Sequence, residues 1–204
     1  MKTTTTFLAA LLATGLLVSS VPAAHAQTWR HTDATGDVVA QDQTDDGVAE
    51  PRVVRGVKQA DVVRLTVQHG ADVLQVATTL RAFGGPDNSW DLRVVTSHGD
   101  TYDFQRCEYS SDGTKSTSSR RNGYRYQCDG LRISRTSAGI VARVPVACLD
   151  IPYRLRVGVQ ARVIYPLVAD PRDRIAQDDA LRTGKVTARK PRLSPWIVRD
   201  SSAR

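Results

Sequence analysis

Two pairs of aspartates, far apart in the chain, have the residue type that binds a divalent cation. Asp33 and Asp37 bracket a tight Thr-Gly turn, and Asp178 and Asp179 are adjacent near the other end of the sequence. Hard cations prefer several carboxylate and carbonyl oxygens gathered at a turn. If the two regions meet in the fold, these four aspartates predict a structural calcium site. The alternative is a solvated turn in which Asp33 and Asp37 accept hydrogen bonds from backbone N–H groups.

A second group of residues could bind a sugar. Tyr109, Tyr124 and Tyr126 flank the polar segment Ser110–Gly123. An exposed aromatic ring offers a ligand an apolar face together with a polar tip. These three tyrosines are therefore the predicted ligand-binding residues, although aromatic residues make up only 6% of the chain.

The three cysteines lie in the second half of the chain. A hairpin turning at Thr136–Gly139 would bring Cys128 close to Cys148 across its open end. We therefore predict a Cys128–Cys148 disulfide, which suits an exported protein. The rival pairing is Cys107–Cys128, because these two residues also flank a hairpin. In the first pairing Cys107 is left as a buried thiol or as a link to a second chain.

The sequence lacks the motifs of the common catalytic classes. It has no Gly-x-Ser-x-Gly elbow, no His-Glu-x-x-His, no Cys-x-x-Cys and no phosphate loop. A glycosidase needs two carboxylates on opposite sides of a bond, and no aspartate pair stands out for that work. We therefore expect a protein that is not an enzyme, with a hydrolase that uses loop aspartates as the alternative.

The first 26 residues have the pattern of a signal peptide. Lys2 supplies a positive charge, Phe7–Val18 an apolar core and Ala24-His25-Ala26 a small-x-small cleavage site. The apolar run is shorter than the roughly 20 residues that span a bilayer. We expect cleavage near Ala26, secretion to the cell exterior and no membrane span. Residues 27–204 are then expected to form a single domain.

The chain is basic, with 28 Lys and Arg against 21 Asp and Glu and a formal net charge of +7. It contains no run of five or more basic residues, which argues against nucleic acid as a partner. The arginines instead alternate with apolar residues, as they would on the solvent face of a sheet.

Apolar residues fall on every second position through much of the chain, which is the pattern of half-buried β-strands. The clearest cases are Ile140–Cys148, Leu155–Val163 and a hairpin that joins Asp61–His69 to Val73–Phe83. About eight or nine strands with short turns and little helix predict an all-β protein, a single antiparallel β-sandwich of the jelly-roll or immunoglobulin-like kind.

Three segments depart from this alternation. Ser110–Gly123 is expected to be a long polar loop. Residues 165–185 are expected to be an irregular Asp-rich loop, with one helical turn at Arg174–Leu181. Residues 191–204 are expected to be a basic C-terminal tail, in which Trp196-Ile197-Val198 adds a last edge strand.

Several short motifs occur in an order that resembles a group of uncharacterised secreted actinobacterial proteins. The shared motifs are Asp33–Val38, Asp61–His69, Cys128–Arg132, Val144–Leu149 and Asp178–Gly184. At the level of architecture the pattern is similar to DOMON-like domains and family-9 carbohydrate-binding modules. That resemblance implies a jelly-roll-like β-sandwich that binds sugars or haem and often carries a structural calcium. Haem ligation by Met and His does not fit, because Met1 is the only methionine.

These expectations describe a secreted, non-catalytic binding or accessory protein of the cell exterior. Its expected partner is a polysaccharide or an anionic envelope polymer. A protein-interaction or inhibitor domain that acts through Ser110–Gly123 is a further alternative.

Overall fold

The computed structural model describes residues 27–44, 47–48, 50–82, 87–109, 113–167, 170–184 and 190–200. The predicted signal peptide lies outside these ranges. Within them the chain is built from antiparallel strands, and the helical element is a four-residue 3-10 turn, η1 (Val146–Leu149). The described part contains no helix of the length and apolar character that a membrane crossing requires.

The first sheet has five strands in the order β1-β5-β6-β12-β11. Their bounds are β1 Gln27–Thr32, β5 Val62–His69, β6 Val73–Leu80, β11 Arg132–Arg135 and β12 Gly139–Pro145. The predicted hairpin of β5 with β6 is confirmed, and the Gly70 N–H closes its turn on the carbonyl of Val73 at 3.1 Å.

The second sheet has ten strands, with the path β10-β9-β8-β7-β13-β14-β2-β3. Off this path, β15 pairs with β13 and β4 pairs with β2. The bounds are β2 Val39–Thr44, β3 Gly47–Val48, β4 Arg52–Val53, β7 Asn88–Thr96, β8 Thr101–Glu108, β9 Lys115–Arg121, β10 Tyr124–Arg125, β13 Arg154–Leu167, β14 Asp170–Asp179 and β15 Ile197–Val198.

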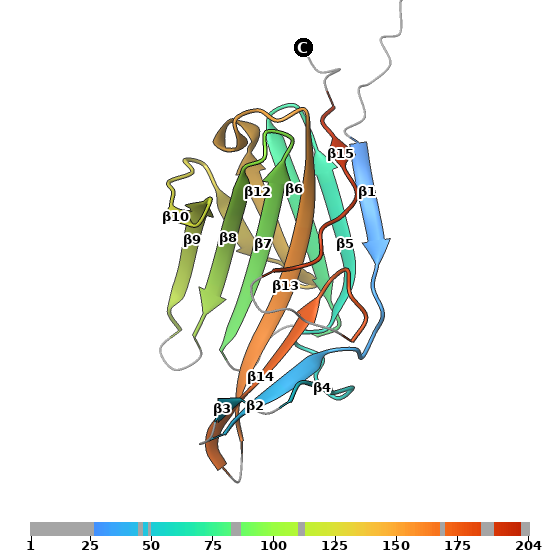
Figure 1. The fold of residues 1–204 in the computed structure, drawn as a ribbon, viewed down its shortest axis with the longest axis vertical. Coiled ribbons are helices and arrows are strands. Elements are labelled where there is room, and N and C mark those ends of the chain that lie inside the picture. The colour runs from blue at the N-terminus through green and yellow to red at the C-terminus, as the bar shows by residue number, and fades with distance from the viewer. Residues whose placement is uncertain are drawn as a thin grey trace, which may run out of the picture.

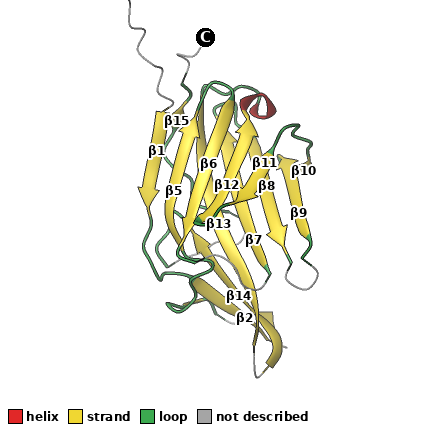
Figure 2. Ribbon diagram, turned by 180° about the vertical axis from the view of Figure 1, so that it is seen from behind, coloured by secondary structure: helices red, strands yellow, loops and turns green. Residues whose placement is uncertain are grey.

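The two sheets lie over each other and share one hydrophobic core (Figures 1 and 2). Leu65 and Leu74 of the first sheet and Trp90 and Phe104 of the second belong to this core. Trp90 is buried in this core, and its indole N–H donates to the Thr78 hydroxyl at 3.0 Å. The predicted all-β class with antiparallel pairing is confirmed.

The predicted disulfide is present. Cys128 and Cys148 are bonded, with their Cα atoms 5.4 Å apart. The hairpin of β11 and β12 turns as expected, since the Thr136 N–H donates to the carbonyl of Gly139 at 2.8 Å. Cys107 lies on β8 as a half-buried free thiol, so the rival Cys107–Cys128 pairing is wrong.

Two of the predicted loops are strands instead. Lys115–Arg121, inside the expected polar loop, forms β9 and pairs along its whole length with β8. Asp170–Asp179, inside the expected irregular segment, forms β14 between β13 and β2, so the helical turn at Arg174–Leu181 is wrong. Both strands lack the apolar alternation that reveals a strand in a sequence, because a polar edge strand and an Asp-rich strand do not produce it.

Candidate functional site

Four aspartates from three distant parts of the chain meet in the interior. Asp33 and Asp37 lie in the loop between β1 and β2, Asp61 precedes β5, and Asp178 stands at the end of β14. Ligand oxygens of Asp37, Asp61 and Asp178 all lie within 4.8 Å of one another. Asp61 and Asp178 are 0% and 1% exposed, and Asp33 and Asp37 are also buried. We call these four residues the acidic cluster.

The local backbone explains how the loop between β1 and β2 reaches the cluster. The Asp33 N–H donates to the carbonyl of Val63 at 3.2 Å, which continues the pairing of β1 with β5. Gly36 then turns the chain with φ of 78°, a left-handed conformation that glycine adopts without a steric cost. The Gly36 N–H points at the carboxylate of Asp61, 2.9 Å away. In this turn Asp33, Gly36 and Asp37 are buried, whereas Ala34 and Thr35 are exposed.

One oxygen of each cluster carboxylate is fixed by the protein. Backbone N–H groups of Ala34, Gly184 and Val62 donate to Asp33, Asp37 and Asp178 at 2.9, 3.1 and 2.8 Å. The corresponding oxygen of Asp61 accepts from the Gly36 N–H and from the Arg81 guanidinium, the latter at 2.7 Å. These contacts hold the carboxylates in place and leave their second oxygens available.

The second oxygen of each cluster carboxylate has no hydrogen-bond partner among the described residues. The four atoms are Asp33 Oδ2, Asp37 Oδ1, Asp61 Oδ1 and Asp178 Oδ1. A buried carboxylate oxygen without a partner loses its hydration with nothing in exchange, which is costly for a charged group. The cluster is therefore electrostatically incomplete unless a proton or a cation sits among these oxygens.

The pKa values show the same imbalance. Burial first, and then the charges of neighbouring aspartates, raise the pKa of Asp33 to about 7 and that of Asp178 to about 8, although a backbone hydrogen bond opposes the change in each. The pKa of Asp37 is also raised, first by burial, while its hydrogen bond from Gly184 opposes the change. Part of the cluster is therefore protonated near neutral pH when no cation is bound.

Asp179, the fourth aspartate of the sequence-based prediction, lies outside the cluster. Its oxygens accept from the N–H groups of Arg192 and Leu181 at 2.8 and 3.2 Å, and Arg182 Nε lies 3.1 Å away. Burial raises the pKa of Asp179, while these hydrogen bonds and the charges of Arg182 and Arg192 lower it. Asp61 takes its place, and the sequence offered only one signal for it, an aspartate at the start of a clear strand.

The cluster suits calcium better than other common metals. All its donors are carboxylate oxygens, with no His or Cys among them, which disfavours zinc. Calcium binds oxygens at about 2.3–2.6 Å, so two ligands on opposite sides of the ion lie about 4.6–5.2 Å apart. Magnesium requires shorter distances and usually keeps several waters. The three oxygens of Asp37, Asp61 and Asp178 lie within 4.8 Å of one another, close enough to bind one calcium ion together.

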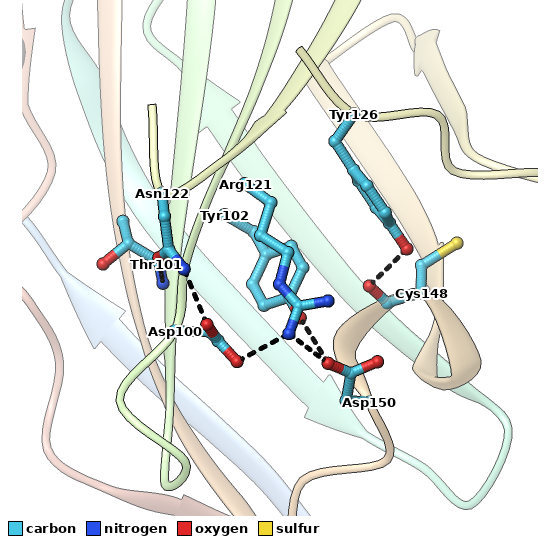
Figure 3. A network of polar contacts seen from close by, with 8 residues as sticks. All are labelled: Asp100, Thr101, Tyr102, Arg121, Asn122, Tyr126, Cys148 and Asp150. Atoms are coloured by element: carbon cyan, nitrogen blue, oxygen red, sulfur yellow. Dashed lines mark hydrogen bonds and ion pairs between the residues drawn. The ribbon is translucent and has the colours of Figure 1, made fainter. Parts of the chain in front are cut away.

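The predicted sugar-binding tyrosines are not brought together. Tyr109 follows Glu108, the last residue of β8, at one end of the ladder between β8 and β9. Tyr124 lies at the other end of this ladder, where Arg121 pairs with Tyr102. Tyr124 is 80% exposed. Tyr126 is half-buried, because its hydroxyl donates to the carbonyl of Cys148 at 3.0 Å and its ring packs edge-on against Tyr102 (Figure 3).

A network of ion pairs lies beside Tyr126 (Figure 3). Arg121 contacts the carboxylates of Asp100 and Asp150 at 2.9 and 2.5 Å, and its guanidinium lies 5.5 Å from the centre of the Tyr102 ring. The Tyr102 hydroxyl donates to Asp150 at 3.3 Å. We call Asp100, Tyr102, Arg121 and Asp150 the Arg121 network. It ties the turns that follow β7, β9 and η1 to one another.

A polar groove of about 420 Å³ crosses the outer face of β9, β8, β7 and β13. Strand register places Arg120, Asp103 and Arg93 in one row across the sheet, and Arg93 forms a two-fold ion pair with Asp103 at 2.7 and 3.0 Å. Pro191 also lines this groove and packs over Gly158, where a Cβ atom would approach its ring to 2.9 Å. We call this the outer-face groove.

No protein-family model matches the chain, and no curated protein matches it.

Proposed function

We propose that the protein is a non-catalytic binding protein of the cell exterior whose fold is stabilised by a calcium ion in the acidic cluster. The observation that carries this proposal is the set of four buried carboxylate oxygens, on Asp33, Asp37, Asp61 and Asp178, that lack a hydrogen-bond partner within the part of the chain that the structure describes. A calcium ion bound by Asp37, Asp61 and Asp178 would link the loop after β1 to the start of β5 and the end of β14, with Asp33 nearby as a further negative charge.

The same aspartates do not suit hydrolysis. A glycosidase must place the scissile bond between its two carboxyl groups, and Asp61 and Asp178 are too deeply buried to contact a polymer chain. Burial first, and then the charges of neighbouring aspartates, raise the pKa of Asp178, and a buried group of carboxylates is also the arrangement that binds a divalent ion. Burial thus favours a structural role for the cluster.

The first test is thermal unfolding of the mature protein in EGTA and in excess calcium. An ion that binds only the folded state stabilises it by about 3–4 kcal/mol at 100 to 1,000 times the dissociation constant. We expect the Tm to rise by several degrees with calcium and by much less with magnesium. Equal Tm values with EGTA and with calcium would refute the calcium site.

The matched variants are Asp178→Asn, inside the cluster, and Asp103→Asn, on the outer face. Asp178→Asn removes a negative charge from a crowded site, so it should raise the Tm in EGTA and abolish the rise with calcium. Asp103→Asn breaks the ion pair with Arg93 and should leave the calcium response unchanged. A purely structural role for Asp178 would instead lower the Tm in both conditions.

The proposed ligand is a polysaccharide or an anionic envelope polymer, bound along the outer-face groove. Its support is chemical, since the groove presents alternating arginine, aspartate, glutamine and serine side chains that can hydrogen-bond hydroxyl and carboxylate groups. Affinity electrophoresis against neutral and anionic polysaccharides tests it. We expect retardation by at least one polymer, and its loss in the double variant Arg93→Ala, Gln105→Ala.

The control for that experiment is Arg143→Ala, on β12 of the other sheet. This variant removes the same charge from an exposed position away from the groove. Equal loss of retardation in both proteins would show non-specific attraction and would contradict the proposed site. Retardation by no polymer would contradict the proposed ligand class.

A further inference from the structure

The outer edge of β9 is open along much of its length. β10 pairs only with Arg120 and Arg121, and after it the Tyr126 N–H donates to the carbonyl of Ser119 at 3.0 Å. Beyond that bond the chain leaves the edge. In the part of the chain that the structure describes, residues Lys115–Ser118 have a strand neighbour on one side alone, which is β8.

Strand geometry shows which backbone groups this edge presents. In an antiparallel ladder, successive residues direct their N–H and C=O groups alternately to the two sides. The carbonyl of Ser119 points to the outer edge, because it accepts from Tyr126. Thr117 and Lys115, two and four residues earlier, must point the same way. Their N–H and C=O groups can therefore pair with a further strand.

A groove runs beside this edge. It has a volume of about 790 Å³ and is lined by Thr117, Ser118, Ser119, Arg120, Arg125, Tyr126, Gln127, Cys128 and Leu131. The apolar part comes from Tyr126, Cys128 and Leu131, which are half-buried and pack against the main core. The charged part comes from Arg120 and Arg125, which are exposed and lie opposite each other in register.

The positive charge of the β9 edge distinguishes between two possible partners, a second copy of this chain and a strand with acidic side chains. β9 and β10 contain Lys115, Arg120 and Arg125 and no acidic residue, whereas Arg121 is already paired with Asp100 and Asp150. A second copy of the chain would place these cations against one another, and like charges on paired strands are destabilising. A strand that carries acidic side chains would neutralise them. The edge is thus protected from self-association and selective for an acidic partner.

We propose that β9 binds an extended acidic peptide as an added strand, over Lys115–Ser118. The peptide occupies the position that β10 vacates at Tyr126. Alternate side chains point to opposite faces of the sheet, so one set meets Tyr126 and Leu131 and the other meets Arg120 and Arg125. The matching sequence alternates apolar and acidic residues. This peptide site goes beyond the proposed polymer and calcium sites, because it uses the backbone of a sheet edge.

The probe is a fluorescein-labelled hexapeptide of alternating Glu and Val, titrated with the mature protein and followed by fluorescence anisotropy. We expect saturable binding that weakens when the salt concentration rises from about 0.05 M to about 0.5 M, since exposed charges are screened. No saturable binding at low salt would overturn the proposal.

Two N-methylated peptides separate strand addition from attraction between charges alone. In an added strand, the amide groups of alternate residues face β9, and the others face solvent. Methylating one facing amide should weaken binding roughly tenfold or more, because a hydrogen bond is lost and a methyl group intrudes. Methylating the next amide should leave the affinity nearly unchanged. Equal affinities of the two methylated peptides would overturn strand addition.

Protein variants give a second readout. The double variant Arg120→Ala, Arg125→Ala should weaken binding and reduce its dependence on salt. The control Arg143→Ala, which lies on the outer face of the other sheet, should bind as the unaltered protein does. An equal loss of affinity in the control and in the double variant would contradict the assigned site.

Discussion

The acidic cluster and the Arg121 network use the same residue types and reach opposite electrostatic states. In the network, Asp100 and Asp150 share one guanidinium at 2.9 and 2.5 Å. In the cluster, four carboxylates converge and Arg81 contacts one oxygen of Asp61. The network lies where β12 ends and the cluster lies where β5 begins, so they occupy opposite ends of the five-stranded sheet.

The pKa values follow the two arrangements. Hydrogen bonds from Asn122 and Arg121 lower the pKa of Asp100, whose side chain is 21% exposed. Burial raises the pKa values of Asp33 and Asp178 to about 7 and about 8. The charges of Asp100 and Asp150 are therefore compensated by Arg121. In the acidic cluster, by contrast, the described residues compensate only part of the negative charge of the buried carboxylates. Predictions can test this difference at both places.

The largest expected effect is the response to calcium in paired Asp→Asn variants. Asp178→Asn in the cluster should remove a calcium stabilisation of about 3–4 kcal/mol, and the variant should be more stable than the unaltered protein in EGTA. Asp150→Asn in the network should lower the Tm slightly, with the calcium response retained. Differential scanning calorimetry in both buffers measures this. Equal responses of the two variants to calcium would contradict the proposed difference between the acidic cluster and the Arg121 network.

The second-largest loss of stability should come from removing the disulfide, and it should be the same with and without calcium. Cys148 lies in η1, just before Asp150, and the bond to Cys128 spans 20 residues. Replacing both cysteines by alanine should cost about 3 kcal/mol, mainly by freeing the unfolded chain. Urea unfolding of the double variant, in EGTA and in calcium, checks both claims. A loss that appears only in EGTA would show that the two ends of the sheet are coupled.

The contributions of the acidic cluster and of the Arg121 network to the stability of the fold should also change with pH in opposite directions. In EGTA, the raised pKa values of Asp33 and Asp178 contribute stability below about pH 4, and this stability is lost as the pH rises toward 8. Saturating calcium should remove that loss. The lowered pKa of Asp100 contributes stability above about pH 4 that disappears on further acidification. Melts between pH 3 and pH 9 resolve both trends, and an apo protein that gains stability from pH 5 to pH 8 would contradict the first.

The smallest expected effect is that of Arg121→Lys. Lysine keeps the charge but cannot contact two carboxylates and a ring with one planar group. Because Arg121 is partly exposed, with 37% of its side chain accessible, water and salt screen its ion pairs. We expect a drop in Tm that is just measurable and disappears at high salt. A drop comparable to the disulfide variant would mean that the network is far less solvated than its exposure indicates.

Much of the fold could be predicted from the sequence because its central strands alternate. β5, β6, β7, β8 and β12 each bury one face, so the period of two was visible and their hairpins followed. β9 exposes most of its side chains, and β14 carries aspartates. In neither strand does hydrophobic burial leave a trace in the sequence, so the pairing with neighbours could be found only in the structure.

The candidate metal site was predicted in part for a similar reason. Asp33, Asp37 and Asp178 were identified because they are grouped in pairs at turns or near them. Asp61 was missed because a single aspartate before a strand looks like a solvated turn, and Asp179 was included because it adjoins Asp178. Only the register of β14 against β13 distinguishes Asp178 from Asp179. It directs Asp179 toward Arg182 and Arg192, and Asp178 toward the acidic cluster. That register cannot be read from the spacing of charges.

The acidic cluster also constrains when this protein can fold. Its hydrogen bonds join residues 116 and 147 positions apart, Val62 with Asp178 and Asp37 with Gly184. Gln27 and Val198 also meet, since the Val198 N–H donates to the Gln27 side chain across 171 positions. These contacts can form only after the strands and loops from Asp178 to Val198 have been synthesised. Pairings between such distant segments slow folding.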